Sequence, residues 1–250
     1  MTSGLPILTF HSIDESGSPV SMATTKFRRL MENLAAEDWV GCTLDEAISP
    51  SVPGGARKVG ICFDDGYRNL LEGALPVLRD LDFAATVFVI AERCGGDNRW
   101  PGQAGGVPTM SLLDWPDLER LRLEGWEVGS HGCDHLPLTS LEPARLLRDL
   151  QRSRALLEQR LDTTVRLLAY PYGASSVEVL RATRSAYDAA FSTRLALATE
   201  ADLAHAFDVP RVDSFYLRRW PAGVPLNSLG ARAYLALRRS ARRLRRGPPR

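Results

Sequence analysis

Short apolar runs rich in β-branched residues alternate with amphipathic helical segments along most of this chain of 250 residues. The runs predicted as strands span residues 5–10, 59–63, 83–90, 126–130, 165–170, 189–192 and 208–212. The segments predicted as helices span residues 25–37, 43–48, 69–81, 113–124, 140–161 and 176–185, with Ser140 as the N-cap of the longest. This alternation is typical of parallel βα units, so it predicts one α/β domain of the barrel-like or doubly wound kind.

Composition narrows the classes of protein that fit. A hydrophobic content of 44% is enough for one large core, and a net charge of +1 gives no overall attraction to nucleic acid, which we do not expect as a partner. The four cysteines are widely spaced, which fits a reducing compartment. The first twenty residues lack a basic start followed by an apolar stretch, so we expect no signal peptide and a cytoplasmic location.

The strand ending at Phe63 is followed by two adjacent carboxylates and a glycine, Asp64-Asp65-Gly66. In α/β folds, functional residues collect at the carboxyl ends of strands. Two neighbouring carboxylates repel each other, and a nearby metal ion or arginine relieves that repulsion. Asp-Gly is also a common turn dipeptide, so the pair by itself would fit a helix-starting turn equally well.

Three of the four histidines, His11, His131 and His135, fall at predicted strand ends. His131 and His135 are four residues apart, but a glycine follows the first and a strand precedes it, so this is not the helical zinc-protease motif. A loop can still direct both imidazoles toward one point. With one carboxylate they would form a catalytic metal site suited to Zn²⁺, and also to Fe, Co or Ni, leaving the second carboxylate free to act as a base.

Three short motifs, in order along the chain, resemble those of the polysaccharide deacetylase family (the NodB-homology domain, carbohydrate esterase family 4). Cys62-Phe63-Asp64-Asp65 is similar to the family's TFDD, His131-Gly132-Cys133-Asp134-His135 to H(S/T)xxH, and Ala169-Tyr170-Pro171-Tyr172-Gly173 to RxPYG. The resemblance covers roughly residues 5 to 215. It implies a distorted (β/α) barrel of about seven parallel strands, which we place at residues 1–228, followed by a basic helix and tail at 229–250.

The resemblance also implies a function. A member of this family would be a metal-dependent carbohydrate N-deacetylase, a hydrolase that releases acetate from an N-acetylated amino sugar in a glycan, glycolipid or sugar metabolite. Asp64 would be the general base, and the backbone N–H of Tyr172 would help to hold the oxyanion. Asp65, His131 and His135 would hold a divalent metal, with Zn²⁺ favoured over Co, Ni or Fe.

The chain departs from the family pattern at three points. Gly132 replaces the usual Ser or Thr, Ala169 replaces an arginine that orients the base, and the late Leu-x-His motif that supplies the general acid is missing. One subgroup, which includes deacetylases of poly-N-acetylglucosamine, has its acid histidine after the first strand and a late Pro-Arg segment. By resemblance to that subgroup, His11 would be the acid and Arg211 would orient the base, with His205 as the competing acid.

Other functions fit parts of the pattern. The same fold could hydrolyse an amide or cyclic imide of a non-sugar, because substrate choice depends on loops such as Arg93 to Pro108. Two imidazoles and a carboxylate also occur in Fe(II) oxygenases, although those are all-β proteins. A catalytically inactive barrel that binds glycans is a further alternative, against which the retained aspartates and histidines argue.

The spacing of apolar residues in the tail predicts a helix from about residue 229 to 245. Its apolar positions, Tyr234, Leu237, Ala241 and Leu244, recur at helical spacing among many arginines. Such a basic amphipathic helix can lie on an anionic membrane surface, where each cation contributes about 1 kcal/mol. Alternatively, the apolar stripe packs on the barrel and the arginines are simply solvated. The sequence is silent on oligomeric state.

Overall fold

The computed structural model describes residues 4–49, 55–103, 105–218, 220, 225–226 and 228–246. Its main sheet has the strand order β10-β1-β5-β6-β7-β8-β9, β4 also pairs with β5, and all pairs are parallel. The strands are β1 (Ile7–Phe10), β4 (Trp39–Cys42), β5 (Arg57–Phe63), β6 (Thr86–Val89), β7 (Glu127–Ser130), β8 (Leu167–Ala169), β9 (Ala189–Phe191) and β10 (Val212–Asp213). The predicted α/β class and the curled sheet of seven consecutive parallel strands are confirmed.

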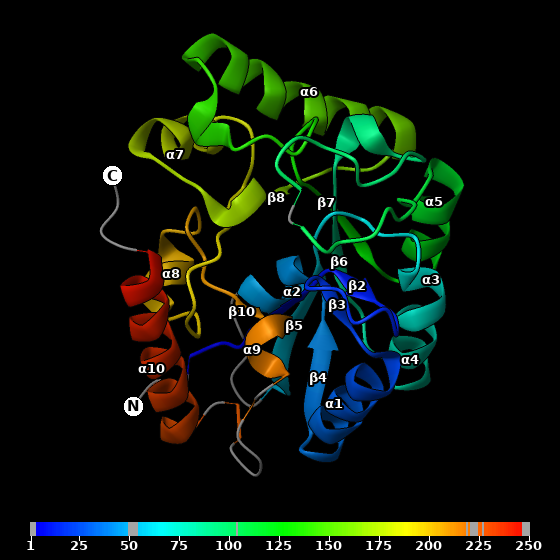
Figure 1. Ribbon diagram of the computed structural model, residues 1–250, viewed down its shortest axis with the longest axis vertical. Coiled ribbons are helices and arrows are strands. Elements are labelled where there is room, and N and C mark those ends of the chain that lie inside the picture. The colour runs from blue at the N-terminus through cyan, green and yellow to red at the C-terminus, as the bar shows by residue number, and fades with distance from the viewer. Residues whose placement is uncertain are drawn as a thin grey trace.

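Helices follow the strands and cover the outside of the sheet, with α6, α5, α4 and α1 arranged around it in Figure 1. The α-helices are α1 (Thr24–Ala36), α2 (Leu44–Ile48), α3 (Leu70–Gly73), α4 (Leu75–Asp80), α5 (Trp115–Leu123), α6 (Pro143–Leu161), α7 (Val177–Arg184), α8 (Glu200–Ala204), α9 (Ser214–Leu217) and α10 (Leu229–Arg246). Short 3-10 turns are η1 (Ala91–Arg93), η2 (Leu138–Ser140) and η3 (Pro171–Gly173), and β2 (Ser12–Ile13) pairs with β3 (Ser21–Met22) in a small second sheet.

Alternate side chains of each strand are buried on opposite faces of the sheet. Leu8 and Phe63 join the large cluster that includes helix residues such as Phe27, whereas Cys62 and Phe88 belong to a smaller cluster on the other face. The sequences of parallel strands that are buried on both faces are continuous apolar runs, without the alternation of apolar and polar residues seen in half-buried strands. This double burial explains why the strands were recognisable from the sequence.

The segment Val209–Asp213, which ends in β10, connects β9 with β1 at the two ends of the curled sheet. Its first residue forms a parallel bridge with Phe191 of β9, and its fourth pairs with Leu8 of β1. Arg211 therefore sits in a stretch of backbone that is anchored on both sides. Its position is fixed by pairing with strands from opposite ends of the sequence.

Some predicted element boundaries are wrong. The longest helix, α6, begins at Pro143 with Glu142 as its N-cap, because proline fits the first helical turn, and Ser140 ends a separate 3-10 turn. The predicted helix 69–81 is divided into α3 and α4 near Ala74, just before Pro76, since proline lacks the N–H that continuous helical bonding needs. Strand β4 and helix α8 were not predicted.

The predicted C-terminal helix is present as α10, but its buried face differs from the predicted stripe. Ala231 and Leu235 are buried, the Tyr234 hydroxyl donates to the Tyr216 carbonyl at 3.1 Å, and Leu237 is 68% exposed. The side chain of Leu244 lies outside the described part of α10. The helix thus packs partly on α9, while the division of the chain at residue 228 stays a prediction. Among the described helices, none has the length and apolar character needed to cross a membrane.

Glu127, at the start of β7, is a buried carboxyl group that should make the free energy of unfolding depend on pH. Its carboxylate accepts hydrogen bonds from the Thr86 hydroxyl (2.6 Å) and the Asp45 N–H (3.3 Å), and burial raises its pKa to about 7 from an ordinary 4.5. Between these values the folded protein keeps a proton that the unfolded chain loses, so the free energy of unfolding falls as pH rises from about 4.5 to about 7. Glu127→Gln removes this contribution.

We therefore expect urea unfolding of Glu127→Gln to lose part of the pH dependence seen in the unsubstituted protein, by up to about 3 kcal/mol over this window. Glu119→Gln is the matched control, because Glu119 lies on the surface of α5 and pairs with Arg122 at 2.7 Å. Parallel pH profiles for the unsubstituted protein and Glu127→Gln would contradict the prediction.

Candidate active site and metal centre

The candidate site is built from loops that follow the carboxyl ends of neighbouring strands. Asp64 and Asp65 follow β5, His131 and His135 follow β7, and Tyr172 follows β8. Asp65, His135 and Tyr172 have positive φ values of 71°, 59° and 59°. Non-glycine residues rarely adopt this left-handed conformation, and such residues tend to collect at functional sites.

Asp65, His131 and His135 form a buried cluster of metal-ligand type. The Asp65 Oδ1 lies 3.4 Å from His131 Nε2 and 3.2 Å from His135 Nε2, and all three ligand atoms fall within 4.8 Å of one another. Their exposed fractions are 6% or less. The structure thus brings together the three residues named as metal ligands from the sequence.

Hydrogen bonding orients the first imidazole for metal binding. The His131 Nδ1 lies 2.8 Å from the carbonyl oxygen of Ala169, which can only accept, so Nδ1 carries a proton and Nε2 is the ring atom that faces Asp65 and would bind a metal. Burial raises the pKa of the Asp65 carboxyl, but hydrogen bonds with both histidines outweigh burial and hold that pKa well below its usual range. An ionised carboxylate beside two imidazole nitrogens is a donor set that fits Zn²⁺ and related divalent ions.

Asp64 is held separately, by Arg211. The guanidinium donates to both carboxylate oxygens, at 2.7 and 2.9 Å, and its Nε donates to the Ser192 carbonyl at 3.2 Å. Burial raises the pKa of the Asp64 carboxyl, but the charge of Arg211 outweighs burial and keeps the pKa below its usual range. Asp64 is therefore ionised and fixed in orientation, as a general base must be.

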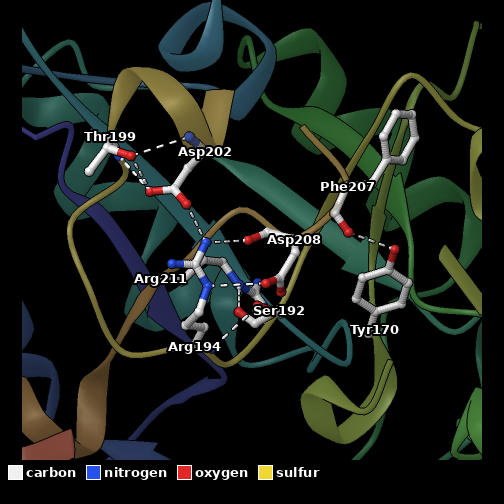
Figure 2. Close-up of polar contacts among 8 residues, drawn as sticks. All are labelled: Tyr170, Ser192, Arg194, Thr199, Asp202, Phe207, Asp208 and Arg211. Carbon is white, nitrogen blue, oxygen red and sulfur yellow. Dashed lines mark hydrogen bonds and ion pairs between the residues drawn. The ribbon is translucent and has the colours of Figure 1, made fainter. Parts of the chain in front are cut away.

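Figure 2 shows the polar contacts that support the segment carrying Arg211. Arg194 lies 3.1 Å from Asp208, also pairs with Asp202 of α8, and accepts a hydrogen bond from the Arg211 N–H at its own carbonyl oxygen (3.1 Å). Thr199 caps α8 by accepting from the Asp202 N–H. These contacts fix the backbone from which the Arg211 side chain reaches Asp64.

Two of the three departures from the family pattern have a local explanation. Gly132 has a φ of 76°, and a Cβ there would lie 3.2 Å from the Asp149 Oδ1, which accepts from the Cys133 N–H. A glycine suits that conformation and that close approach. Ala169 is fully buried, and the guanidinium that faces Asp64 comes from Arg211 instead.

The structure places the two candidate acid histidines differently. His11 follows β1, is half-buried, and lies close enough for its charge to lower the pKa of both Asp64 and Asp65. His205 is exposed at the C-cap of α8. His11 is thus the histidine that the structure places near Asp64 and Asp65.

Trp100 was not identified from the sequence as a neighbour of His135, and Tyr172 was named only for its backbone N–H. The ring of Trp100 and the ring of Tyr172 each lie 4.5 Å from the His135 ring, centroid to centroid. Trp100 belongs to the long irregular loop that was expected to choose the substrate, and Tyr67 is fully buried beside it in the same apolar cluster. The available signal was one tryptophan within a Gly- and Pro-rich loop.

Comparisons with known proteins agree with this geometry. A sequence profile described as polysaccharide deacetylase matches residues 51–188, more than half of the chain, so the chain belongs to the polysaccharide deacetylase family. It is 27% identical over 181 residues to the putative polysaccharide deacetylase YxkH of Bacillus subtilis, covering 71% of this chain and 60% of that protein. It is also 27% identical over 173 residues to the poly-beta-1,6-N-acetyl-D-glucosamine N-deacetylase of Staphylococcus epidermidis, covering 65% of this chain and 57% of that enzyme.

Solved structures share the fold. IcaB from Ammonifex degensii superposes with a TM-score of 0.74 at 22% identity, covering 94% of this chain and 98% of that one. The Streptococcus pyogenes deacetylase PplD, solved in complex with acetate, gives 0.73 at 20% identity, covering 85% and 93%. At these identities the likeness concerns the fold.

Metal binding is tested by His131→Ala, with His205→Ala as the control. We expect the unsubstituted protein and His205→Ala to retain a divalent metal after dialysis, and His131→Ala to lose it, because the variant keeps two of three protein ligands. Elemental analysis measures the metal, and thermal unfolding checks that each variant folds. Full metal occupancy in folded His131→Ala would show that the ligand set is wrong.

Proposed function

We propose that this chain is a metal-dependent hydrolase that removes the N-acetyl group from an N-acetylated amino sugar and releases acetate. One observation carries the proposal: the cluster of Asp65, His131 and His135 lies directly beside an ionised Asp64 that Arg211 holds with two hydrogen bonds. A metal-ligand cluster and a separately oriented carboxylate are two parts that metal-assisted hydrolysis of an unactivated amide uses.

The substrate class is proposed from the relatives. Several of them are poly-beta-1,6-N-acetyl-D-glucosamine N-deacetylases, and this chain spans about 60% of the length of the curated relatives that it matches. A β-1,6-linked or other N-acetylglucosamine-containing glycan is therefore the first substrate to test. Nucleotide sugars and glycolipids are the next.

Each residue has a proposed task. A divalent ion held by Asp65, His131 and His135, most fittingly Zn²⁺, would acidify a water molecule and polarise the acetyl carbonyl. Asp64 accepts the proton of the attacking water, and the backbone N–H of Tyr172 donates to the developing oxyanion. His11 donates a proton to the leaving nitrogen, since an amine anion is a very poor leaving group.

Two further proposals concern location. We propose a cytoplasmic enzyme whose helix α10 contacts anionic membrane surfaces, based on the arginines of α10 and on exposed apolar side chains, Leu237 of α10 and Phe215 of the neighbouring α9. Co-sedimentation with anionic liposomes, comparing the full chain with one that ends at Asn227, tests this contact. Equal pelleting of both chains would exclude it.

The proposed activity is tested by acetate release with Asp64→Asn. We expect the unsubstituted enzyme to release acetate from N-acetylglucosamine oligomers, and Asp64→Asn to keep its metal but lose kcat by about 10² or more, the usual scale for a general base. Asp134→Asn is the matched control, because Asp134 lies in the loop between the two histidines and pairs with Arg93 at 3.7 Å.

The substrate panel includes glycolipids and a cyclic imide, each with and without added metal. Turnover of the imide without acetate release from any sugar would favour the non-sugar hydrolase. Near-normal turnover by Asp64→Asn would show that Asp64 is not the base.

The role of His11 is tested by the choice of leaving group. We expect His11→Ala to retain metal and fold but to lose amide hydrolysis by about 10² or more, while losing much less activity toward acetate esters of acidic phenols, whose leaving groups need no proton. His205→Ala serves as the control for the competing acid. Equal losses on both substrates, or the larger loss in His205→Ala, would contradict the assignment.

A further inference from the structure

The two imidazoles of the metal centre have outer partners of different kinds. His131 is oriented by a backbone carbonyl, whereas the His135 Nδ1 lies 3.1 Å from the hydroxyl oxygen of Tyr172. If His135 Nε2 is to present a lone pair to a metal, its Nδ1 carries the proton and donates to the Tyr172 oxygen. The Tyr172 hydroxyl is then free to donate in its turn.

The hydroxyl of Tyr172 meets the tip of the long loop. It donates to the Pro101 carbonyl at 3.4 Å, and a Cβ on Gly102 would lie 3.3 Å from it. Trp100, in the same turn, packs against the His135 ring and is 4% exposed. The Trp100–Gly102 turn thus contacts both Tyr172 and His135.

The ends of the loop that carries the Trp100–Gly102 turn are held together by hydrogen bonds of their own. The side chain of Asn98 is 1% exposed, donates to the Pro108 carbonyl at 2.9 Å, and accepts from the Met110 N–H at 2.9 Å. These bonds close the loop at its base. At its tip, the hydrogen bond from Tyr172 is a polar contact that joins the turn to the metal centre.

We propose that Tyr172 is a positioning residue that acts through its hydroxyl. The hydroxyl orients His135 for metal binding, and it also holds the Trp100–Gly102 turn over the metal centre. This role is separate from that of the Tyr172 backbone N–H and rests on the proposed metal site. Because one hydroxyl serves both partners, metal binding and ordering of the turn stabilise each other. Coupling of this kind is reciprocal, so a change in the turn also changes metal affinity.

The test uses Tyr172→Phe, which removes the hydroxyl and keeps both the ring and the backbone N–H. We expect it to bind Zn²⁺ about 10–100-fold more weakly in a chelator competition titration of the metal-free protein, the usual effect of losing an outer partner. The visible absorption bands of the Co²⁺-loaded protein should shift as well. Tyr170→Phe is the matched control, since its hydroxyl donates to the Phe207 carbonyl at 2.9 Å (Figure 2) and not to a candidate metal ligand.

Ordering of the Trp100–Gly102 turn by metal binding is measured by backbone hydrogen exchange of residues 97–103. We expect Zn²⁺ to slow exchange there in the unsubstituted protein and to do so less in Tyr172→Phe. Gly102→Ala approaches the same contact from the loop, because its φ of 89° and the 3.3 Å approach to the hydroxyl disfavour a methyl group. It should also weaken Zn²⁺ binding, although it touches no metal ligand.

The outcomes separate this proposal from the proposed function. Tyr172→Phe and Gly102→Ala variants that bind Zn²⁺ as tightly as the unsubstituted protein would overturn the positioning role. Weaker binding with unchanged exchange of the turn would overturn the coupling. Failure of the unsubstituted protein to bind Zn²⁺ or Co²⁺ would overturn the metal site itself.

Discussion

The buried ion pair between Asp64 and Arg211 is the interaction on which the rest of the site depends. Both side chains are nearly inaccessible to water, and removing one partner of such a pair typically costs about 3–5 kcal/mol because the other charge is left unpaired. The pair joins the end of β5 to the segment that spans the gap between β9 and β1. It therefore ties the closure of the sheet to the orientation of the candidate base.

The pair also resolves the repulsion between two adjacent carboxylates. Asp64 directs both of its oxygens at Arg211, whereas the positive φ of Asp65 turns the second carboxylate toward the two imidazoles. Each carboxylate thus has its own positive or proton-donating partners. Left-handed conformations at non-glycine residues cost on the order of 1–3 kcal/mol and persist only where the surrounding structure holds them.

The sequence predicted the sheet because its strands are buried on both faces, and it brought Asp65, His131 and His135 together because parallel strands end at one edge. It did not predict β4, since four residues containing a glycine carry little strand signal. Trp100 was missed for another reason: a long loop has no periodicity, so nothing local indicates that its tip returns to His135. The buried face of α10 was predicted incorrectly because it is set by packing against Tyr216 of α9, a tertiary contact that local sequence does not indicate.

The outer partners of the two histidines set different limits on motion at this site. The Ala169 carbonyl belongs to β8, so the orientation of His131 can change only if the sheet itself moves. Tyr172 is 41% exposed, and its hydroxyl contacts both His135 and Pro101 of the long loop, so the hydroxyl can follow that loop. One candidate ligand, His131, is therefore held by the sheet, and the other, His135, contacts a loop outside the sheet. A barrel built this way can vary that loop while the sheet keeps the position of His131.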